Sequence, residues 1–385
     1  MRSAWQLDDS IHFLNHGSFG ATPRVVLERQ RELRERLEAE PVRFMVRELE
    51  PLLDEARARL ADFVGAQPSD LAFVTNASTG VNAVLRSLDF KPGDELLTTN
   101  HGYNACTNAL RFVAERTGAR VVVAQVPFPV ASSQTLNDAV LAAVTPKTKL
   151  VMLDQITSPT ALIFPIAQLV RELEGRGIPV LVDAAHAPGQ VPLFLDTTGA
   201  SFTTGNLHKW VCAPKGCGFL HVRKDWQARI RPTVISHGAN SSRSDRSRFQ
   251  LEFDWVGTQD PTPYLCVPAA LDFMGSLVDG GWPALMALNH AEAVAARAVL
   301  LEAFPQELPC PPQLLGSMAS VVMEGAPEDL GDRLFNDFQV EVPVIPFAGK
   351  TLVRVSLQRH VRPGDVPALA RALKGLLSPH PDPLP

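Results

Sequence analysis

The chain has 385 residues, of which 45% are apolar and 20% charged, and its formal net charge is −5. These values are ordinary for a globular protein of about two to three domains, and they exclude a mainly disordered chain, a collagen and a coiled-coil rod. The slight acidity argues against a general nucleic-acid binder. Five cysteines without a CxxC pair make a disulfide framework or a bound metal unexpected.

Two features of the sequence bear on its location. The first residues contain no apolar core of signal-peptide length, and no run approaches about 18 consecutive apolar residues. We therefore expect a cytoplasmic protein that has no membrane-spanning helix. Residues 378–385 alternate proline with other residues and are expected to form a flexible tail.

Residues 22–66 are expected to be mainly helical, with a solvated charged face, and strand and helix patterns then alternate up to residue 225. Short apolar runs predict strands at 71–74, 95–99, 120–126, 150–154, 180–183, 201–204 and 218–222. The spacing between them predicts a helix that runs to 88 and further helices at 104–115 and 166–176. This alternation predicts an α/β fold with a mostly parallel mixed sheet covered by helices.

The pattern changes after residue 260. Here the sequence predicts two helices and three strands, in the order helix 285–304, strands 318–323, 340–345 and 352–357, and helix 366–377. These elements are typical of a smaller α+β domain. We therefore expect a large domain over residues 20–260 and a small domain that joins residues 1–19 to residues 261–377.

Three candidate site features follow predicted strands, at the edge where open α/β sheets bind ligands. The first is Thr75-Asn-Ala-Ser-Thr-Gly80, where hydroxyl residues open a helix. The free N–H groups of a helix start suit a phosphate. A plain helix N-cap is the alternative interpretation.

The second feature is Asp183, which ends a buried strand and is followed three residues later by His186. A buried carboxylate needs a partner, and one candidate is a protonated heteroaromatic nitrogen. A helix cap or a structural ion pair is the alternative. The third feature is Lys209, one of eight lysines in the chain, within Asn206-Leu-His-Lys-Trp210.

Desolvation among apolar neighbours lowers the pKa of a lysine and makes its amine a nucleophile for a Schiff base. A lysine that reaches out of a turn to solvent is the alternative for Lys209. Lys215, in a glycine turn, is a weaker candidate. A fourth feature, Arg354, lies in an alternating strand pattern and either clamps a carboxylate or faces solvent. A phosphate site, then an aspartate, then a lysine is the order that pyridoxal phosphate needs.

With these residues in place, the chain resembles the class V aminotransferase family of fold-type I pyridoxal-phosphate enzymes, which have the aspartate aminotransferase-like fold. Within that family it is most similar to the isopenicillin N epimerase-like branch. The likeness rests on Leu14-Asn-His-Gly-Ser-Phe-Gly-Ala21, Asn100-His-Gly-Tyr-Asn-Ala105, Ile156-Thr-Ser-Pro-Thr-Ala161 and Asn206-Leu-His-Lys-Trp210.

The resemblance implies that Lys209 is the internal aldimine lysine, that Asp183 pairs with the pyridine nitrogen, and that His186 hydrogen-bonds the ring oxygen. It also implies a set of residues that hold the phosphate, namely Ala77, Ser78, Thr79, Asn206 and His208.

The resemblance further implies an obligate homodimer with active sites at the interface, in which Thr258 reaches the neighbouring subunit's phosphate. Arg354 is expected to clamp the α-carboxylate of the substrate, and His16 to contribute to substrate binding. An ungapped comparison places Tyr103 on the cofactor ring, with His101 as the alternative. Ser158 stands where related desulfurases have an asparagine near the ring oxygen.

The implied function is catalysis on an amino acid or an amino-acid-like amine through an external aldimine and a Cα carbanion. An isopenicillin N epimerase-like reaction is favoured, with Tyr103 or His101 serving the second face of Cα. A carbon–sulfur lyase of the hercynylcysteine sulfoxide lyase type and an aminotransferase are the alternatives. Cysteine desulfurase activity is disfavoured because Cys310, between prolines, does not resemble the required loop cysteine.

Two other function classes are less consistent with the sequence. A dinucleotide-dependent oxidoreductase would carry GxGxxG after its first strand, and the stretch 75–80 has one glycine. A non-catalytic relative would have lost Lys209 or Asp183. Side-chain recognition is expected around Arg43, His237 and Arg359.

Overall fold

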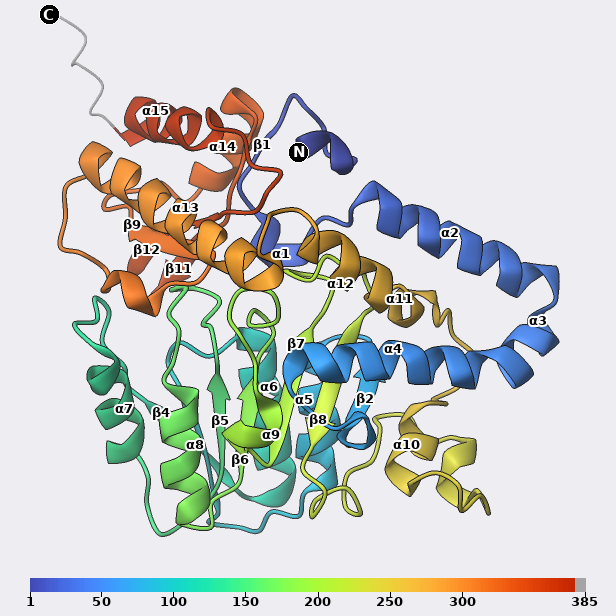
Figure 1. The fold of residues 1–385 in the computed structure, drawn as a ribbon. Coiled ribbons are helices and arrows are strands. Elements are labelled where there is room, and N and C mark those ends of the chain that lie inside the picture. Colours follow the sequence, from blue (N-terminus) through green and yellow to red (C-terminus); the bar gives the residue numbers. More distant parts are fainter. Residues whose placement is uncertain (378–385) are drawn as a thin grey trace, which may run out of the picture.

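A computed structural model describes residues 1–377, so the predicted tail at 378–385 lies outside the described residues. A large sheet with flanking helices forms one part of the molecule, and a smaller α+β part lies beyond one end of the strands (Figure 1). The predicted α/β fold class is confirmed.

Within residues 1–377, seven strands form the central sheet in the order β2-β8-β7-β6-β5-β3-β4. Strand β8 runs opposite to the other strands of this sheet, so the sheet is mixed but mostly parallel. The strands are β2 (Leu71–Val74), β3 (Glu95–Thr99), β4 (Arg120–Ala124), β5 (Thr148–Asp154), β6 (Val180–Asp183), β7 (Phe202–Asn206) and β8 (Gly218–Val222).

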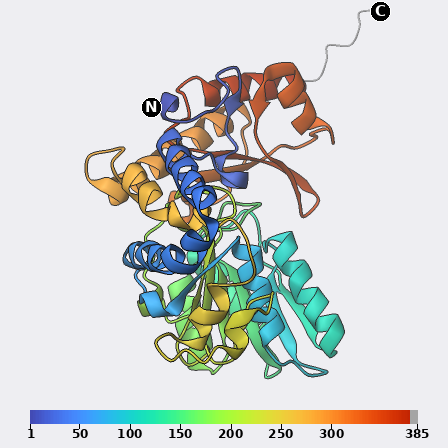
Figure 2. The same ribbon diagram turned by 90° about the vertical axis from the view of Figure 1, so that its right-hand side faces the viewer.

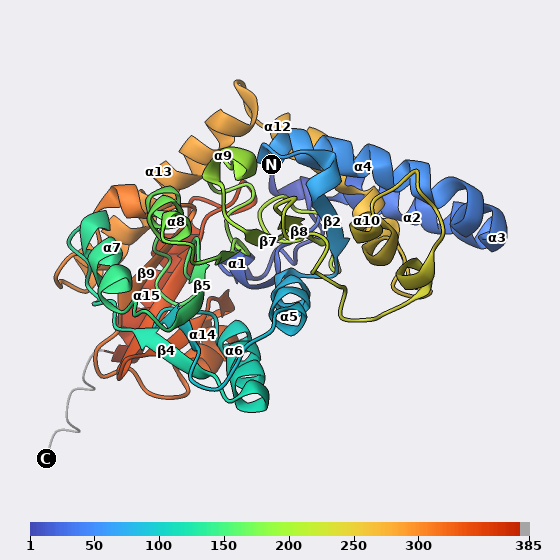
Figure 3. The ribbon, with the colours of Figure 1, turned by 90° about the horizontal axis from the view of Figure 1, so that it is seen from below.

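Helices cover both faces of this sheet because successive strand residues point to opposite sides. Leu150 and Met152 of β5 pack into one apolar cluster, and Val151 and Leu153 pack into the other. Figure 3 shows α5 and α6 on one face and α8 on the other. The covering helices are α5 (Ala77–Ser87), α6 (Asn104–Thr117), α7 (Ser133–Ala142), α8 (Ile166–Gly175) and α9 (Leu195–Thr198).

Residues 22–66 are mainly helical, as the sequence predicts. Helices α2 and α4 are joined by a short helical link and pack against α11 and α12 (Figure 1). The elements of residues 22–66 are α2 (Arg24–Ala39), α3 (Pro41–Arg43), a π-helical turn (Phe44–Glu48) and α4 (Leu49–Val64). The helices that follow the last strand of the large sheet are α10 (Arg248–Phe253), α11 (Thr262–Leu265) and α12 (Val267–Gly275).

The smaller part contains a sheet in the order β11-β12-β9 and a separate pairing of β1 with β10. The predicted strand at 340–345 is two strands, because Pro343 lacks the N–H that a continuous strand would donate. The elements are β1 (His12–Phe13), α13 (Gly281–Ala303), β9 (Met318–Val322), α14 (Leu330–Phe338), β10 (Val340–Glu341), β11 (Val344–Phe347), β12 (Lys350–Ser356) and α15 (Asp365–Leu377).

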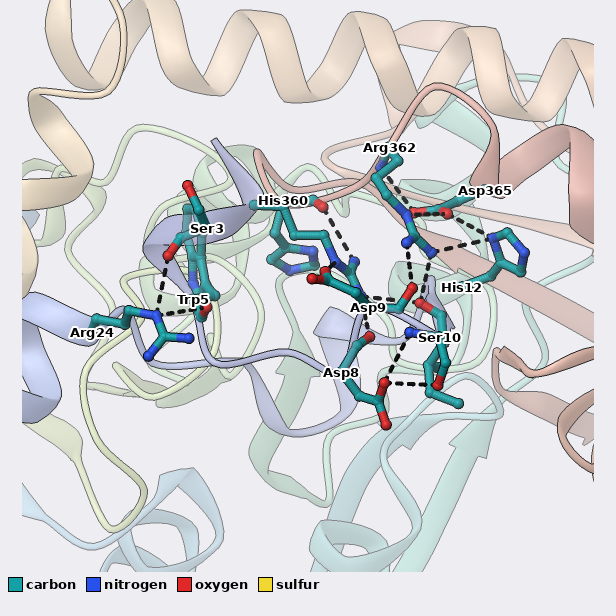
Figure 4. Close-up of polar contacts among 12 residues, drawn as sticks. Ser3, Trp5, Asp8, Asp9, Ser10, His12, Arg24, His360, Arg362 and Asp365 are labelled. Atoms are coloured by element: carbon teal, nitrogen blue, oxygen red, sulfur yellow. Dashed lines mark hydrogen bonds and ion pairs between the residues drawn. The ribbon is translucent and has the colours of Figure 1, made fainter.

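Polar contacts tie the N-terminal segment to the C-terminal part (Figure 4). His12 Nδ1 lies 2.7 Å from Asp365 Oδ1, and Arg362 Nε donates to the same oxygen at 2.9 Å. Arg362 also donates to the carbonyls of Asp9 and Ile11. Residues 9–12 therefore lie beside Arg362 and Asp365 in the smaller part of the molecule (Figure 2), while the exact domain division at residue 260 stays a prediction.

By length and composition alone, helix α13 could cross a membrane, whereas the sequence predicts no membrane-spanning helix. Several polar residues interrupt the apolar run of α13, among them Asn289 and Arg297. Both side chains are buried. Asn289 Nδ2 donates to Gln358 Oε1 at 3.1 Å, and Arg297 Nη1 donates to the Cys310 carbonyl at 2.7 Å. These contacts, and its packing on β9 and α15, are those of a helix in a protein core.

Candidate active site

The carboxyl ends of β5, β6 and β7 bring the predicted site residues to one edge of the sheet, which faces the smaller part of the molecule (Figure 1). Asp154 and Asp183 are Cα partners in the β5–β6 register, and Asp183 pairs with Thr204 of β7. Asn206 ends β7, three residues before Lys209. The strand register alone therefore places the carboxylates beside the lysine loop.

Asp183 is the buried carboxylate of this edge. Its Oδ1 accepts from the Ala185 N–H at 2.9 Å, and the Cys106 thiol donates to its Oδ2 at 3.1 Å. Burial raises the pKa of Asp183 above its usual value. A protonated ring nitrogen would supply the cation that an ionised carboxylate needs here.

Lys209 is buried, and its Nζ lies 3.1 Å from His186 Nε2. Burial first, and then the positive charge of Arg354, lower the pKa of Lys209 to about 8. The indole N–H of Trp210 donates to His186 Nδ1 at 3.4 Å, so the neutral imidazole carries its proton on Nε2, facing the amine. The environment therefore favours a neutral, nucleophilic lysine.

This lowered pKa predicts how the cofactor-free protein captures pyridoxal phosphate. Only the neutral amine reacts, so the capture rate should fall about tenfold per pH unit below pH 7 and level off above about pH 8. Stopped-flow absorbance across the pH range measures this rate. A rate that keeps rising past pH 9 would indicate an ordinary lysine and contradict the desolvated environment.

His16 does not occupy the substrate-binding position that the sequence predicts. It is fully buried, and its Nε2–H donates to the Lys209 carbonyl at 3.0 Å. Its Nδ1 accepts from His360 Nε2 at 2.9 Å. Both ring nitrogens are thus occupied, and burial lowers the pKa of His16 to about 3, which keeps the ring neutral. His16 positions the lysine loop and leaves no ring nitrogen for a substrate.

Gly20 holds the N-terminal segment against the same loop. Its φ is +69°, and a Cβ there would lie 2.0 Å from the His208 carbonyl oxygen. Gly20→Ala should therefore displace the lysine loop, cost about 2 kcal/mol or more of stability and reduce cofactor retention. Denaturant unfolding and absorbance measure the two effects.

Gly93→Ala is the matched control for Gly20→Ala, because Gly93 has a φ of +89° and nothing within 4 Å of its Cβ position. It should show backbone strain alone and keep its cofactor. Equal losses in the two variants would argue against the loop contact.

The predicted phosphate turn is the N-terminus of α5. Asn76 caps it by accepting from the Thr79 N–H at 2.9 Å, and the Ala77 N–H donates to Asn206 Oδ1 at 2.8 Å. The Ser78 N–H has no acceptor among the described residues. The Ser78 N–H and the turn hydroxyls are therefore better placed for a phosphate than the Ala77 and Thr79 amides. The Nδ1–H of His208 donates to the Cys217 carbonyl at 3.1 Å, so Nε2 remains for a ligand.

Arg354 of β12 is buried and has no carboxylate partner within residues 1–377. Its Nη1 donates to the Ser158 carbonyl at 2.6 Å and to Ser158 Oγ at 3.0 Å, and its Nη2 donates to Ser18 Oγ at 3.3 Å. Its Nε has no partner among these residues. Burial lowers the pKa of Arg354 to about 10. A buried guanidinium without a counter-ion is suited to an anionic ligand.

Ser158 thus supports this arginine, and its place near the cofactor's ring oxygen stays a prediction. Ser18 was not predicted as a site residue, although it lies in the Leu14–Ala21 segment that carries part of the family resemblance.

Tyr103 is the more accessible of the two aromatic candidates. It is 43% exposed, and its N–H donates to Asp154 Oδ2 at 3.1 Å. His101 is fully buried, with Nδ1 2.7 Å from Thr160 Oγ1 and Nε2 3.1 Å from the Val126 carbonyl. A ring held in this way is not available to a cofactor, so the structure disfavours the His101 alternative.

Asp154 is the residue that sequence reasoning missed. It is buried, its Oδ1 has no partner in the described chain, and burial together with Asp183 raises its pKa well above the usual value. The available signal was that two predicted strands, 150–154 and 180–183, both end in aspartate.

The four remaining predicted residues make no polar contact with Lys209 or Arg354 within the described part of one chain. Thr258 is exposed in the loop after α10, where a neighbouring subunit is expected. Arg43 pairs with Glu48, Arg359 pairs with Glu292, and His237 is exposed. None of these four has a hydrogen bond or ion pair to Lys209 or Arg354 within the described chain.

The comparisons with known proteins bear on this geometry. The sequence model of the class V aminotransferase family matches residues 13–302. Isopenicillin N epimerase of Amycolatopsis lactamdurans is 33% identical, with 97% of each chain covered. A putative L-cysteine desulfhydrase 1 of Oryza sativa subsp. japonica is also 33% identical, over 86% of this chain and 72% of its own.

Solved structures confirm the fold. A lysine-to-alanine mutant of C-DES, with glycine covalently linked to its PLP cofactor, has a TM-score of 0.84 at 19% identity and covers 98% of this chain and 99% of its own. The family match also confirms pyridoxal phosphate as the cofactor, and the buried aspartate, the lysine and the helix start fit it. The chain therefore belongs to the class V aminotransferase family of pyridoxal-phosphate enzymes.

Proposed function

We propose that the enzyme acts at the Cα of an amino acid or an amino-acid-like amine, whose carboxylate binds Arg354. The main support for this proposal is that Arg354 is buried and lacks a carboxylate partner in the described chain. Arg354 also lies close enough to Lys209 to lower the pKa of the lysine amine. A substrate carboxylate would neutralise this guanidinium. It would also place the adjacent Cα near the lysine.

Pyridoxal phosphate supplies the electron-accepting ring that stabilises negative charge at Cα when a proton leaves. Asp183 would keep the ring nitrogen protonated, and Ser78, Thr79 and Asn206 would hold the phosphate. Lys209 is the group that removes and returns the Cα proton, because its lowered pKa lies near neutral pH, where a general base works best.

Epimerisation is the reaction that we favour. It needs a proton donor on the side of Cα away from Lys209. The Tyr103 hydroxyl is our candidate because Tyr103 is accessible and its N–H donates to Asp154 at the same edge of the sheet. The likeness to isopenicillin N epimerases over nearly the whole chain supports this choice.

Elimination at a carbon–sulfur bond is the second candidate, supported by the likeness to L-cysteine desulfhydrases. Cysteine desulfurase chemistry remains disfavoured, because all five cysteines are buried and Cys310 contacts Arg297 in the smaller part. Incubation of the holoenzyme with amino acids and peptide-like amines separates the reactions. Loss of chirality alone supports epimerisation, whereas release of pyruvate and sulfide, or of a keto acid, would replace it by elimination or transamination.

Tyr103→Phe tests the second proton donor. The variant keeps the ring and loses only the hydroxyl, so Cα proton exchange should persist while epimerisation falls by roughly 10²-fold or more. Chiral chromatography measures the epimer, and mass spectrometry in deuterated water measures the exchange. Unchanged epimerisation would exclude the tyrosine hydroxyl from this role.

A homodimer is also part of the proposal. Gly257 and Gln259, on either side of Thr258, line a cavity with Met45, close to Val46, which is 72% exposed. An exposed apolar side chain beside this loop fits a covering subunit. Light scattering on the holoenzyme should give twice the mass of one chain, and a monomer that is fully active would contradict shared active sites.

A further inference from the structure

A second cluster of ligating side chains lies at the opposite end of the central sheet. Asp70 ends a 3₁₀ turn (Pro68–Asp70) just before β2, Asp196 lies in α9, and His221 lies in β8. His221 pairs with Leu71 at the start of β2 and with Thr203 near the start of β7. The cofactor site lies beyond the other ends of these parallel strands, so the cluster is separate from it.

The ligand atoms of the three residues all lie within 4.8 Å of one another. His221 Nε2 is 3.5 Å from Asp196 Oδ1, which is longer than an ordinary hydrogen bond. Two ligands bound at 2.0–2.1 Å to a tetrahedral zinc ion are about 3.3 Å apart. The spacing therefore suits two ligands of one ion better than it suits a direct hydrogen bond.

The buried imidazole of His221 lacks hydrogen-bond partners. It is 3% exposed, and neither of its ring nitrogens has a hydrogen-bond partner in the described chain. Buried polar atoms nearly always have a partner, so an orphaned imidazole beside two carboxylates indicates a missing one. A neutral imidazole is also the form that binds metals.

Neighbouring side chains orient the two carboxylates. Gln227 Nε2 donates to Asp70 Oδ1 at 2.8 Å, and Ser69 Oγ donates to the same oxygen at 3.0 Å. Gln67 Nε2 donates to Asp196 Oδ2 at 3.4 Å. The other carboxylate oxygen of each aspartate has no hydrogen-bond donor among the described residues. Outer hydrogen bonds of this kind are typical of metal-binding carboxylates.

We propose that Asp70, Asp196 and His221 bind a divalent metal ion and that zinc fits best. One imidazole nitrogen and two carboxylate oxygens are zinc ligands, whereas calcium and magnesium prefer oxygen alone. The side chain of Asp196 is 36% exposed, so water can complete the coordination. The ion would join the start of β2, helix α9 and β8. It would thereby brace the sheet from the end opposite the cofactor.

The test is zinc binding by the holoenzyme after treatment with a chelator. Equilibrium dialysis with Zn²⁺ alone should find one ion per chain, and Zn²⁺ should raise the melting temperature while the visible cofactor spectrum stays unchanged. Asp196→Asn removes one charged ligand at an exposed position and should weaken binding at least about tenfold. His221→Gln should abolish stoichiometric binding if it folds.

Asp329→Asn is the matched control, because Asp329 is exposed, makes no side-chain cap contact and carries the same charge change. It should bind zinc like the wild type. The proposal is overturned if wild-type protein binds no stoichiometric zinc, or if Asp196→Asn and Asp329→Asn bind equally. In the first case His221 would be a buried neutral imidazole beside two carboxylates, with no ion between them.

Discussion

Lys209→Ala is expected to remove the visible absorbance of covalently bound cofactor and to lower turnover by roughly 10²–10⁴-fold. The buried amine is the nucleophile that binds the cofactor, and it is also the group that moves the Cα proton. Alanine retains neither function. Absorbance spectra and steady-state rates of the purified variant measure both effects.

Lys215→Ala is the control for this experiment, since Lys215 was the weaker lysine candidate of the sequence. Its Nζ donates to the Gly20 carbonyl at 3.0 Å, so the amine already has a hydrogen-bond partner in the folded chain. The variant should stay yellow and active. If the Lys215→Ala protein is colourless, or if the Lys209→Ala protein is yellow and active, the cofactor is bound by Lys215 and not by Lys209.

Arg354→Gln is expected to lower kcat/KM for a carboxylate-bearing substrate by at least about thirtyfold while cofactor content stays normal. Loss of a buried, charge-assisted hydrogen-bond pair costs about 2 kcal/mol or more, and about 1.4 kcal/mol corresponds to tenfold. Arg354→Lys keeps the charge but loses the planar fork, so it should restore only part of the activity.

A substrate analogue that lacks the carboxylate also tests the contact between Arg354 and the substrate carboxylate. The wild type should discriminate strongly against this analogue, and Arg354→Gln should discriminate little. If Arg354→Gln keeps the wild-type preference for the carboxylate, another residue binds that group. Ser158 and Ser18 would then have to be reconsidered as well, because their contacts with Arg354 place them at the same position.

Local patterns were sufficient to predict most of the central sheet. The strands at 71–74, 95–99, 180–183 and 218–222 have the predicted bounds, because each is a short apolar run between turn signals. Helix α7 was missed although Ser132 caps it by accepting from the Thr135 N–H. The strand at 340–345 was predicted as one because the effect of Pro343 depends on which partner each half pairs with.

The candidate site was likewise predictable only where local sequence determines the role of a residue. Lys209 and Asp183 could be predicted because the residues next to them in the sequence indicate a buried lysine and a buried carboxylate. The place of His16 could not be predicted, because its two contacts are with Lys209 and His360, far away in the chain. The burial of His101 and the role of Ser158 likewise depend on side chains from distant segments.

Proton exchange at Cα tests the proposed function most directly. Holoenzyme, Lys209→Ala protein and a panel of amino acids and peptide-like amines are incubated in deuterated water, and deuterium and configuration at Cα are followed by NMR. We predict deuterium incorporation with accumulation of the opposite configuration for the true substrate, and neither result with Lys209→Ala. Turnover without deuterium at Cα, or equal exchange in the absence of Lys209, would contradict the proposed reaction at Cα.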